Sequence, residues 1–212
     1  MKNLLSAILV LSAVSGAAQA ELLTLKPGTQ TCEGRSVPGG ATANIPNKPA
    51  ELTTAAFGLR AKKVAVVNVK VYCAEILVTD GTLYAHDAGN ALASVVKMPT
   101  SAIRLDFLRA VDAQTVKSSF VDAFNANHVD VNSPKIAAFL NVVAAGGTAE
   151  SGKSLTIVFD LMTAAIYYED GNGKVSSMPS DPDTNAQILS IWLGTPADAG
   201  LATLKSQLTS VR

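Results

Sequence analysis

The stretch from residue 52 to residue 78, which reads LTTAAFGLRAKKVAVVNVKVYCAEILV, decides the fold. Its second half has a period of two residues, in which Val67, Val69, Val71 and Cys73 alternate with Asn68, Lys70, Tyr72 and Ala74. Because successive side chains of a β-strand point to opposite faces, this alternation predicts a strand. The dipeptide Asp80-Gly81 is typical of a turn and ends the strand.

The remaining sequence predicts further strands and five helices. Strands are expected over 101–108, 154–159, 164–168 and 174–178, the last two joined by the hairpin turn Asp170-Gly171-Asn172-Gly173. Helices are expected over 87–97, 112–127, 133–146, 183–193 and 195–208, where Asp87, Asp112, Ser133 and Thr195 are candidate N-caps. Strands that follow one another as hairpins favour an antiparallel sheet with helices on one face, so the predicted class is α+β.

The first residues have the pattern of a cleaved secretion signal. Lys2 gives a positive start, residues 4–14 are apolar, and Ala18-Gln19-Ala20 is a small-x-small cleavage site. The apolar run is too short for a comfortable membrane span. We therefore expect cleavage after Ala20 and a periplasmic protein, with residues 21–50 as an irregular lead-in holding one short strand at most, and residues 51–212 as the domain.

Charge and composition exclude some partners. The chain has 17 basic and 17 acidic residues and no basic patch, which argues against a nucleic-acid-binding protein. Later apolar stretches are all interrupted by charge or glycine, so no stable membrane insertion is expected after signal cleavage. The oligomeric state stays open.

The two cysteines, Cys32 and Cys73, leave two alternatives. An even pair in an exported protein could form a disulfide. Cys73, however, lies in a strongly apolar strand, where a cysteine usually behaves as a small apolar side chain. The sequence does not give the distance between their Cα atoms, which would decide.

Most signatures of catalysis and of metal binding are absent from the sequence. His86 and His128 stand in polar stretches without cysteine or carboxylate at metal-ligand spacing. No glycine-rich phosphate loop follows a strand, and no Gly-x-Ser-x-Gly motif occurs. We expect no metal, no cofactor and no catalytic residue.

Arg60 is the unusual residue of the deciding stretch, because it precedes the most apolar part of the chain. A buried guanidinium needs a partner. That partner is either an acidic or carbonyl group of the protein, or the carboxylate of a ligand. Tyr72, twelve residues later, is either a core tyrosine with a satisfied hydroxyl or a second polar group for the same carboxylate.

Three stretches together resemble the chalcone isomerase superfamily. They are Phe57-Gly58-Leu59-Arg60 with Lys70-Val71-Tyr72, then LDFLRAVD at 105–112, and ILSIWLGTP at 188–196. The resemblance extends from about Ala55 to Leu208 and implies an open-faced β-sandwich, with a large antiparallel sheet, a layer of helices and a ligand cleft between them. The superfamily holds plant isomerases, non-catalytic relatives and fatty-acid-binding proteins.

The same resemblance favours the binding members over the isomerases. The arginine of the superfamily falls on Arg60, and Tyr72 matches the tyrosine that the fatty-acid binders have in the next strand. The catalytic tyrosine, lysine and asparagine of the isomerases fall on Ala113, Val116 and Phe120, and a late threonine or serine falls near Asn185. Because those donors would orient the substrate and stabilise an enolate, their absence disfavours the isomerase reaction.

We therefore expect a non-catalytic carrier of a fatty acid or a similar apolar carboxylate. The expected ligand-binding residues are Arg60, Tyr72, Arg109, Val116 and Phe120, with Phe124 on the same helix face; for Arg109, an acidic neighbour or solvent is the competing partner. Two alternatives remain. One is an envelope structural or interaction protein whose cleft is filled by its own side chains, and the other is an isomerase or lyase acting on a small hydroxylated substrate.

Overall fold

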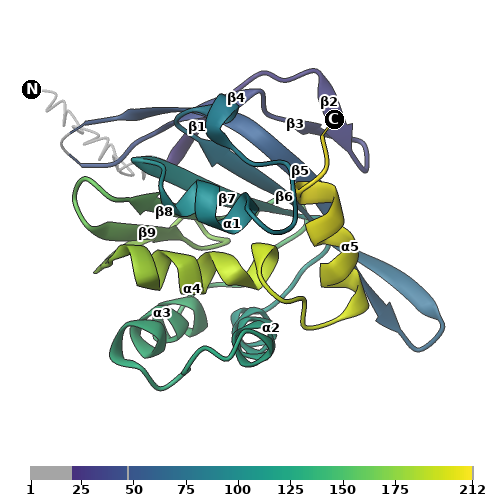
Figure 1. Ribbon diagram of the computed structural model, residues 1–212. Helices are drawn as coiled ribbons and strands as arrows, with labels where there is room; N and C mark the ends of the chain where they lie inside the picture. Colours follow the sequence, from purple (N-terminus) through teal and green to yellow (C-terminus); the bar gives the residue numbers. More distant parts are fainter. Residues whose placement is uncertain (1–20, 47, 212) are drawn as a thin grey trace, which may run out of the picture.

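The computed structural model describes residues 21–46 and 48–211. Its main element is a curled, eight-stranded antiparallel sheet covered on one face by helices (Figure 1). This arrangement confirms the α+β class and the open-faced sandwich expected from the sequence. The predicted secretion signal, residues 1–20, lies outside the described residues.

The eight strands of the sheet lie side by side in the order of the sequence, and two further short strands, β2 and β3, lie outside it. In spatial order they are β1 (Leu23–Lys26), β4 (Gly40–Ala43), β5 (Ala50–Val64), β6 (Val67–Val78), β7 (Thr100–Phe107), β8 (Ser154–Asp160), β9 (Ala165–Glu169) and β10 (Val175–Pro179). A separate hairpin is made by β2 (Gln30–Cys32) and β3 (Arg35–Val37). The segment 21–50 thus contains four strands, where the sequence suggested an irregular lead-in. Strands of three or four residues are too short to show a period.

The helices lie close to their expected positions. They are α1 (Ala91–Val96), α2 (Ala113–Ala126), α3 (Pro134–Ala144), α4 (Pro182–Leu193) and α5 (Ala199–Leu208), with a short 3-10 turn η1 (Gly81–Leu83) before α1. The expected cap of α2 is confirmed, since Asp112 accepts a hydrogen bond from the Thr115 amide at 2.9 Å. At α3 the helix begins after Ser133 as expected, but the Ser133 side chain makes no capping bond.

Two predicted helix starts were wrong. Asp87 accepts from the amides of Gly89 and Asn90 and closes a turn, and α1 begins only at Ala91. The cap of α5 is Asp198, which accepts from the Leu201 amide at 2.9 Å. Thr195 is instead held in the preceding loop by Asn127, whose side chain bonds both its amide and its carbonyl.

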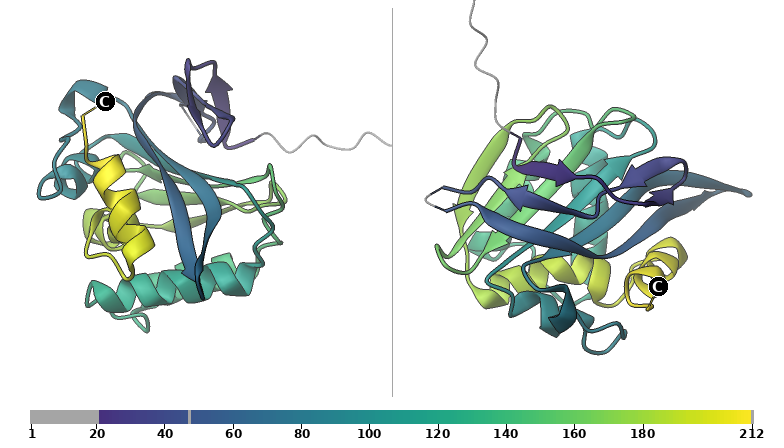
Figure 2. Two further views of the ribbon diagram at one scale, coloured as in Figure 1. Left: turned by 90° about the vertical axis from the view of Figure 1, so that its right-hand side faces the viewer. Right: turned by 90° about the horizontal axis from the view of Figure 1, so that it is seen from above.

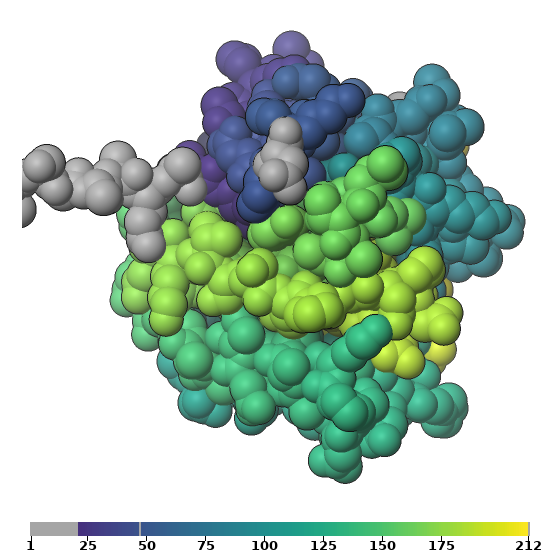
Figure 3. All heavy atoms as spheres, turned by 90° about the vertical axis from the view of Figure 1, so that its left-hand side faces the viewer, coloured from purple at the N-terminus to yellow at the C-terminus, as the bar shows by residue number. Residues whose placement is uncertain are grey.

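The two faces of the sheet carry separate apolar cores. On the helical face, alternate residues of β6 and β7, such as Ile76 and Leu105, pack against α2, α3, α4 and α5. On the other face, Leu77 and Ala102 pack against β1 and β4, because the sheet curls over. The N-terminal strands therefore lie on the side opposite α2 and α3 (Figures 2 and 3).

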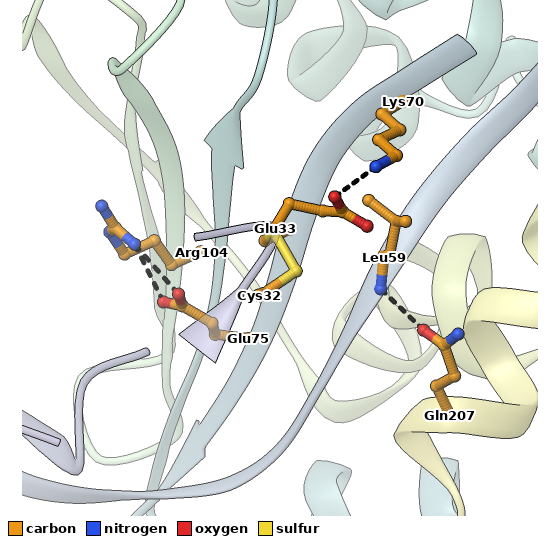
Figure 4. Close-up of a disulfide and its surroundings, with 8 residues drawn as sticks. Cys32, Glu33, Leu59, Lys70, Glu75, Arg104 and Gln207 are labelled. Atoms are coloured by element: carbon orange, nitrogen blue, oxygen red, sulfur yellow. Dashed lines mark hydrogen bonds and ion pairs between the residues drawn. A yellow bond between two sulfur atoms is a disulfide. The ribbon is translucent and has the colours of Figure 1, made fainter. Parts of the chain in front are cut away.

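A disulfide attaches the β2–β3 hairpin to this outer face. Cys32 and Cys73 are bonded, with their Cα atoms 6.2 Å apart. Glu33 forms an ion pair with Lys70 beside the disulfide (Figure 4). The alternative that Cys73 is only a small apolar core residue is therefore wrong. A small third core of Cys32, Val37, Phe57 and Cys73 fills the space under the hairpin.

The β5–β6 pair is irregular at its centre and extends beyond the sheet. Arg60 is opposite Tyr72, but Ala61 is opposite Lys70, so Val71 is an extra residue in β6. This bulge breaks the strict alternation predicted for 67–74 and allows Val69 and Tyr72 to line the same pocket. Since β7 pairs only from Tyr72 onward, residues 61–71 project as a two-stranded arm (Figure 1).

Candidate functional site

A pocket of about 300 Å³ lies where the arm, the end of β7, and the starts of α2 and α5 meet. All five residues expected to bind ligand line it: Arg60, Tyr72, Arg109, Val116 and Phe120. Its other walls include Lys62, Val69, Val71, Leu105, Phe107, Asp112, Asp198 and Leu201. The fold thus brings together side chains from the strands β5, β6 and β7 and from the helices α2 and α5.

Arg60 lies at the inner, polar end of the pocket and already has protein partners. It is only 6% exposed. One guanidinium nitrogen is 2.5 Å from Asp198 Oδ2, and another donates to the carbonyl oxygen of Ala61. Of the two alternatives for Arg60, pairing within the protein is therefore observed. The guanidinium also bonds the Tyr72 side chain, and these contacts together use only part of its five N–H donors.

Asp198 combines two roles, because its Oδ1 caps α5 while its Oδ2 pairs with Arg60. Burial alone would favour the neutral acid. The Leu201 amide and the Arg60 charge outweigh that effect, so the pKa of Asp198 lies below its usual value. The pair is charged at neutral pH.

The close contact of α5 with β5 depends on a glycine. A Cβ atom at Gly200 would lie 1.8 Å from the Ala61 carbonyl oxygen and 1.9 Å from Arg60 Nη1. A side chain there would push the start of α5 away from Arg60. Gly200 therefore positions the Arg60–Asp198 pair.

Tyr72 presents a hydroxyl beside Arg60. Its oxygen accepts a hydrogen bond from Trp192 Nε1 at 3.2 Å, and within the described part of the chain its own hydrogen is donated to no acceptor. Burial raises the pKa of Tyr72 above its usual value, although the Arg60 charge opposes this. The hydroxyl is therefore a protonated donor that a ligand could use.

The apolar wall of the pocket is partly aromatic. Phe107 packs edge-on against Tyr72, with ring centroids 5.6 Å apart, and Phe120 packs edge-on against Trp192 at 5.4 Å. Val116 lies one turn before Phe120 on α2 and lines the same wall. Phe124, expected on this face, is fully buried in the core and does not line the pocket.

Two cations without ion-pair partners stand at the outer rim. Arg109 and Lys62 are both exposed, and neither forms an ion pair within residues 21–46 and 48–211. Asp112 and Asp122 also line the pocket, and Asp112 is engaged as the α2 cap. An acidic partner for Arg109 is therefore not observed, and its guanidinium faces solvent.

Sequence reasoning missed three residues of this site. Asp198 was expected only as part of the helix 195–208, Trp192 only as part of the stretch 188–196, and Lys62 was given no role. The Asp198 carboxylate lies 138 residues after Arg60, and no local pattern reports such a contact. The usable signal for the cap was the residue type, since Asp is among the preferred N-cap residues and Asp198 directly precedes the helical stretch.

The positions that correspond to isomerase residues hold no donor aimed at the pocket. Ala113 begins α2, and Val116 and Phe120 give the apolar wall. Asn185 is buried elsewhere and accepts a hydrogen bond from Ser180. Within the described residues, no group of His, Cys, Asp and Glu could hold a metal ion, and no helix is long and apolar enough to cross a membrane.

Comparison with known proteins identifies the family. A model described as chalcone isomerase-like matches residues 36–208. The chain belongs to the chalcone isomerase-like family. A search of curated proteins found no significant match to this chain.

A solved structure supports the assignment of the fold. The crystal structure of the Arabidopsis thaliana fatty-acid-binding protein AtFAP1 is similar, with a TM-score of 0.61 and 15% sequence identity. The match covers 87% of this chalcone isomerase-like chain and 96% of the other chain. At this identity the similarity establishes the shared fold.

Proposed function

We propose that this chalcone isomerase-like protein binds a fatty acid or similar amphipathic carboxylate in the pocket between the arm, α2 and α5. The observation that carries the proposal is the arrangement of the pocket. A buried guanidinium and a free hydroxyl hydrogen lie at one end, and an aromatic wall lies along the side. The fatty-acid-binding activity named for the similar Arabidopsis protein supports it.

The polar end suits a carboxylate in spite of the Arg60–Asp198 pair. The unused donors of Arg60 can bind one carboxylate oxygen while Asp198 stays in place. Tyr72 can donate its hydrogen to the same group, since it has no other acceptor among the described residues. Lys62 and Arg109 at the rim add positive charge that attracts an anion.

The size of the pocket favours a short tail. Ligand pockets usually measure about 300–1,000 Å³, so this one is at the lower end. Burying each methylene contributes about 0.8 kcal/mol, or about fourfold in affinity, until the wall is filled. Longer tails would extend past Val64 and Val69 along the arm.

We further propose that the protein acts in the periplasm as a carrier or sequestering protein. The support is the secretion-signal pattern of residues 1–20 and the disulfide, which is typical of an oxidising compartment. Mass measurement of the protein from a periplasmic extract tests export. We expect a chain that starts at Glu21; an uncleaved chain in the cytoplasm would contradict the proposal.

Native mass spectrometry of the exported protein, followed by organic extraction, tests ligand binding. We expect a co-purifying carboxylic acid that is absent from Arg60→Met and retained in Arg35→Met, whose arginine lies on the β2–β3 hairpin. An empty wild-type protein, unchanged in melting temperature by added fatty acids, would favour a purely structural role for the Arg60–Asp198 pair.

A further inference from the structure

The tip of the β5–β6 arm exposes valines to solvent. Val64 is 56% exposed, Val66 92% and Val67 59%. They are contiguous, and they stand at the end of a ribbon that projects past β7 (Figure 1). Single exposed apolar residues are ordinary. Contiguous exposed apolar residues are typical of a surface that contacts a membrane, a partner protein or a ligand.

The turn at this tip is built from unusual residues. Val64 and Val67 are opposite each other, so Ala65 and Val66 form a two-residue turn. Ala65 has a φ of 52°, in the left-handed region. Such turns favour Asn, Asp and Gly, which adopt this conformation readily and are polar or small. Here alanine and valine stand where a turn usually has Asn, Asp or Gly. Residues that break such local preferences are often found at functional sites.

The arm also carries a local excess of positive charge. Residues 61–71 contain Lys62, Lys63 and Lys70 and no acidic residue, although the whole chain has equal numbers of both. Lys70 pairs with Glu33, whereas Lys62 and Lys63 form no ion pair with any described residue. Free positive charge thus stands directly behind the apolar tip.

We propose that this tip docks the protein on a bilayer that contains anionic phospholipid. The valines enter the boundary between headgroups and acyl chains, and the lysines bind the lipid phosphates. A protein partner is less suited, because a stable interface needs about 800 Å² from each side, which a four-residue tip does not offer. A bilayer needs no complementary shape.

Docking in this way brings the pocket to the membrane. Val64 and Val69 share one face of the ribbon and line the pocket, so a path along the two valines leads from the tip to the pocket, with Lys62 opposite Val69. Transfer of an acyl ligand along this path rests on the proposed function. The docking itself does not rest on the proposed function, and it can be tested without any ligand.

Sedimentation of the full mature chain with vesicles tests the docking. One set contains phosphatidylglycerol and phosphatidylcholine in equal parts, and the other phosphatidylcholine alone. We expect binding to the first set only, weakened about fivefold by Lys63→Gln and about tenfold by Val66→Asp. Raising the salt concentration should release the protein, because ions screen exposed charges.

Met162→Asp is the matched control, since Met162 is 80% exposed in the β8–β9 turn at the opposite end of the sheet. It should bind like the wild type. Equal binding to both vesicle sets, or unchanged binding by Val66→Asp, would overturn the proposal. So would a loss of self-association in Val66→Asp without any change in vesicle binding, which would make the partner a second copy.

Discussion

At the residue scale, the pocket depends on the close approach of α5 to β5 at Gly200. Gly200→Ala places a methyl group within 2 Å of two heavy atoms, by the distances from the ideal Cβ of 1.8 and 1.9 Å. Overpacking of this kind costs about 1–3 kcal/mol. We expect that loss in urea denaturation, together with weaker carboxylate binding, because Asp198 and Arg60 would be displaced.

A matched substitution separates this effect from the general cost of losing glycine. Gly81→Ala adds a methyl group whose nearest contact is 3.7 Å away, on Thr53. Its effect should remain within about 0.5 kcal/mol. If Gly200→Ala were equally mild, the start of α5 would not be held as described.

A second residue-scale prediction concerns Glu75, which is buried on the outer face and held by Arg104 at 3.0 and 3.1 Å (Figure 4). Burial raises the pKa of Glu75 to about 7, although the Arg104 charge opposes this. The folded state therefore binds this proton more tightly than the unfolded chain, so stability declines as pH rises from about 4.5 to 7.

Arg104→Met should make this decline larger, because loss of the arginine charge raises the pKa of Glu75 further and the decline then continues to higher pH. At pH 8 the variant buries an unpaired carboxylate, at a cost of about 3 kcal/mol; near pH 5 Glu75 takes up a proton and the cost is far smaller. Urea denaturation at both pH values measures the difference. The double variant with Glu75→Gln should lose this pH dependence. A pH-independent cost in the single variant would contradict the assignment.

At the element scale, the disulfide fixes the β2–β3 hairpin to β6. It closes a loop with a sequence separation of 41 residues, and a cross-link of that span stabilises by about 3–4 kcal/mol in the chain-entropy model. Cys32→Ala with Cys73→Ala should lower the free energy of unfolding by about that amount. Limited proteolysis should then cut first within residues 26–38.

Treatment of the wild type with a reductant is the control and should give the same two changes. An unaltered cleavage pattern in both samples would show that the small core around Val37 and Phe57 holds the hairpin without the disulfide.

The elements that the sequence predicted well are those with a long periodic pattern or a local cap. β7 and α2 were expected within one or two residues of their observed limits, because alternation and the Asp112 cap act over a few residues. The predicted caps Asp87 and Thr195 were wrong. The Asp87 side chain accepts hydrogen bonds that close a turn, and the Thr195 backbone is bonded by Asn127 in a loop. Local sequence does not show which of these competing bonds is made.

At the scale of the whole molecule, the fold follows from the sequence and its family resemblance, while the contacts of the pocket do not. Arg60 was found from its place before the most apolar part of the chain, Tyr72 from its place in the valine-rich strand, and both from the family resemblance. Their partners Asp198 and Trp192 come from the other end of the chain and meet them only after α4 and α5 pack on the sheet. The alternation of apolar and polar residues over 67–74 did not predict the bulge at Val71. The bulge nevertheless determines which side chains of β6 line the pocket.

The central claim is that the pocket binds an amphipathic carboxylate through Arg60 and Tyr72. Trp192, the only tryptophan of the chain, reports on it, because its indole is bonded to the Tyr72 hydroxyl. The measurement is a titration of Trp192 fluorescence with hexanoic, decanoic and palmitic acid, with decanol as the uncharged control. We predict saturable single-site binding of the acids, weaker binding of decanol, and a loss of at least about tenfold in Arg60→Met. Equal binding of decanol and decanoic acid, or no saturable change with any acid, would contradict the claim.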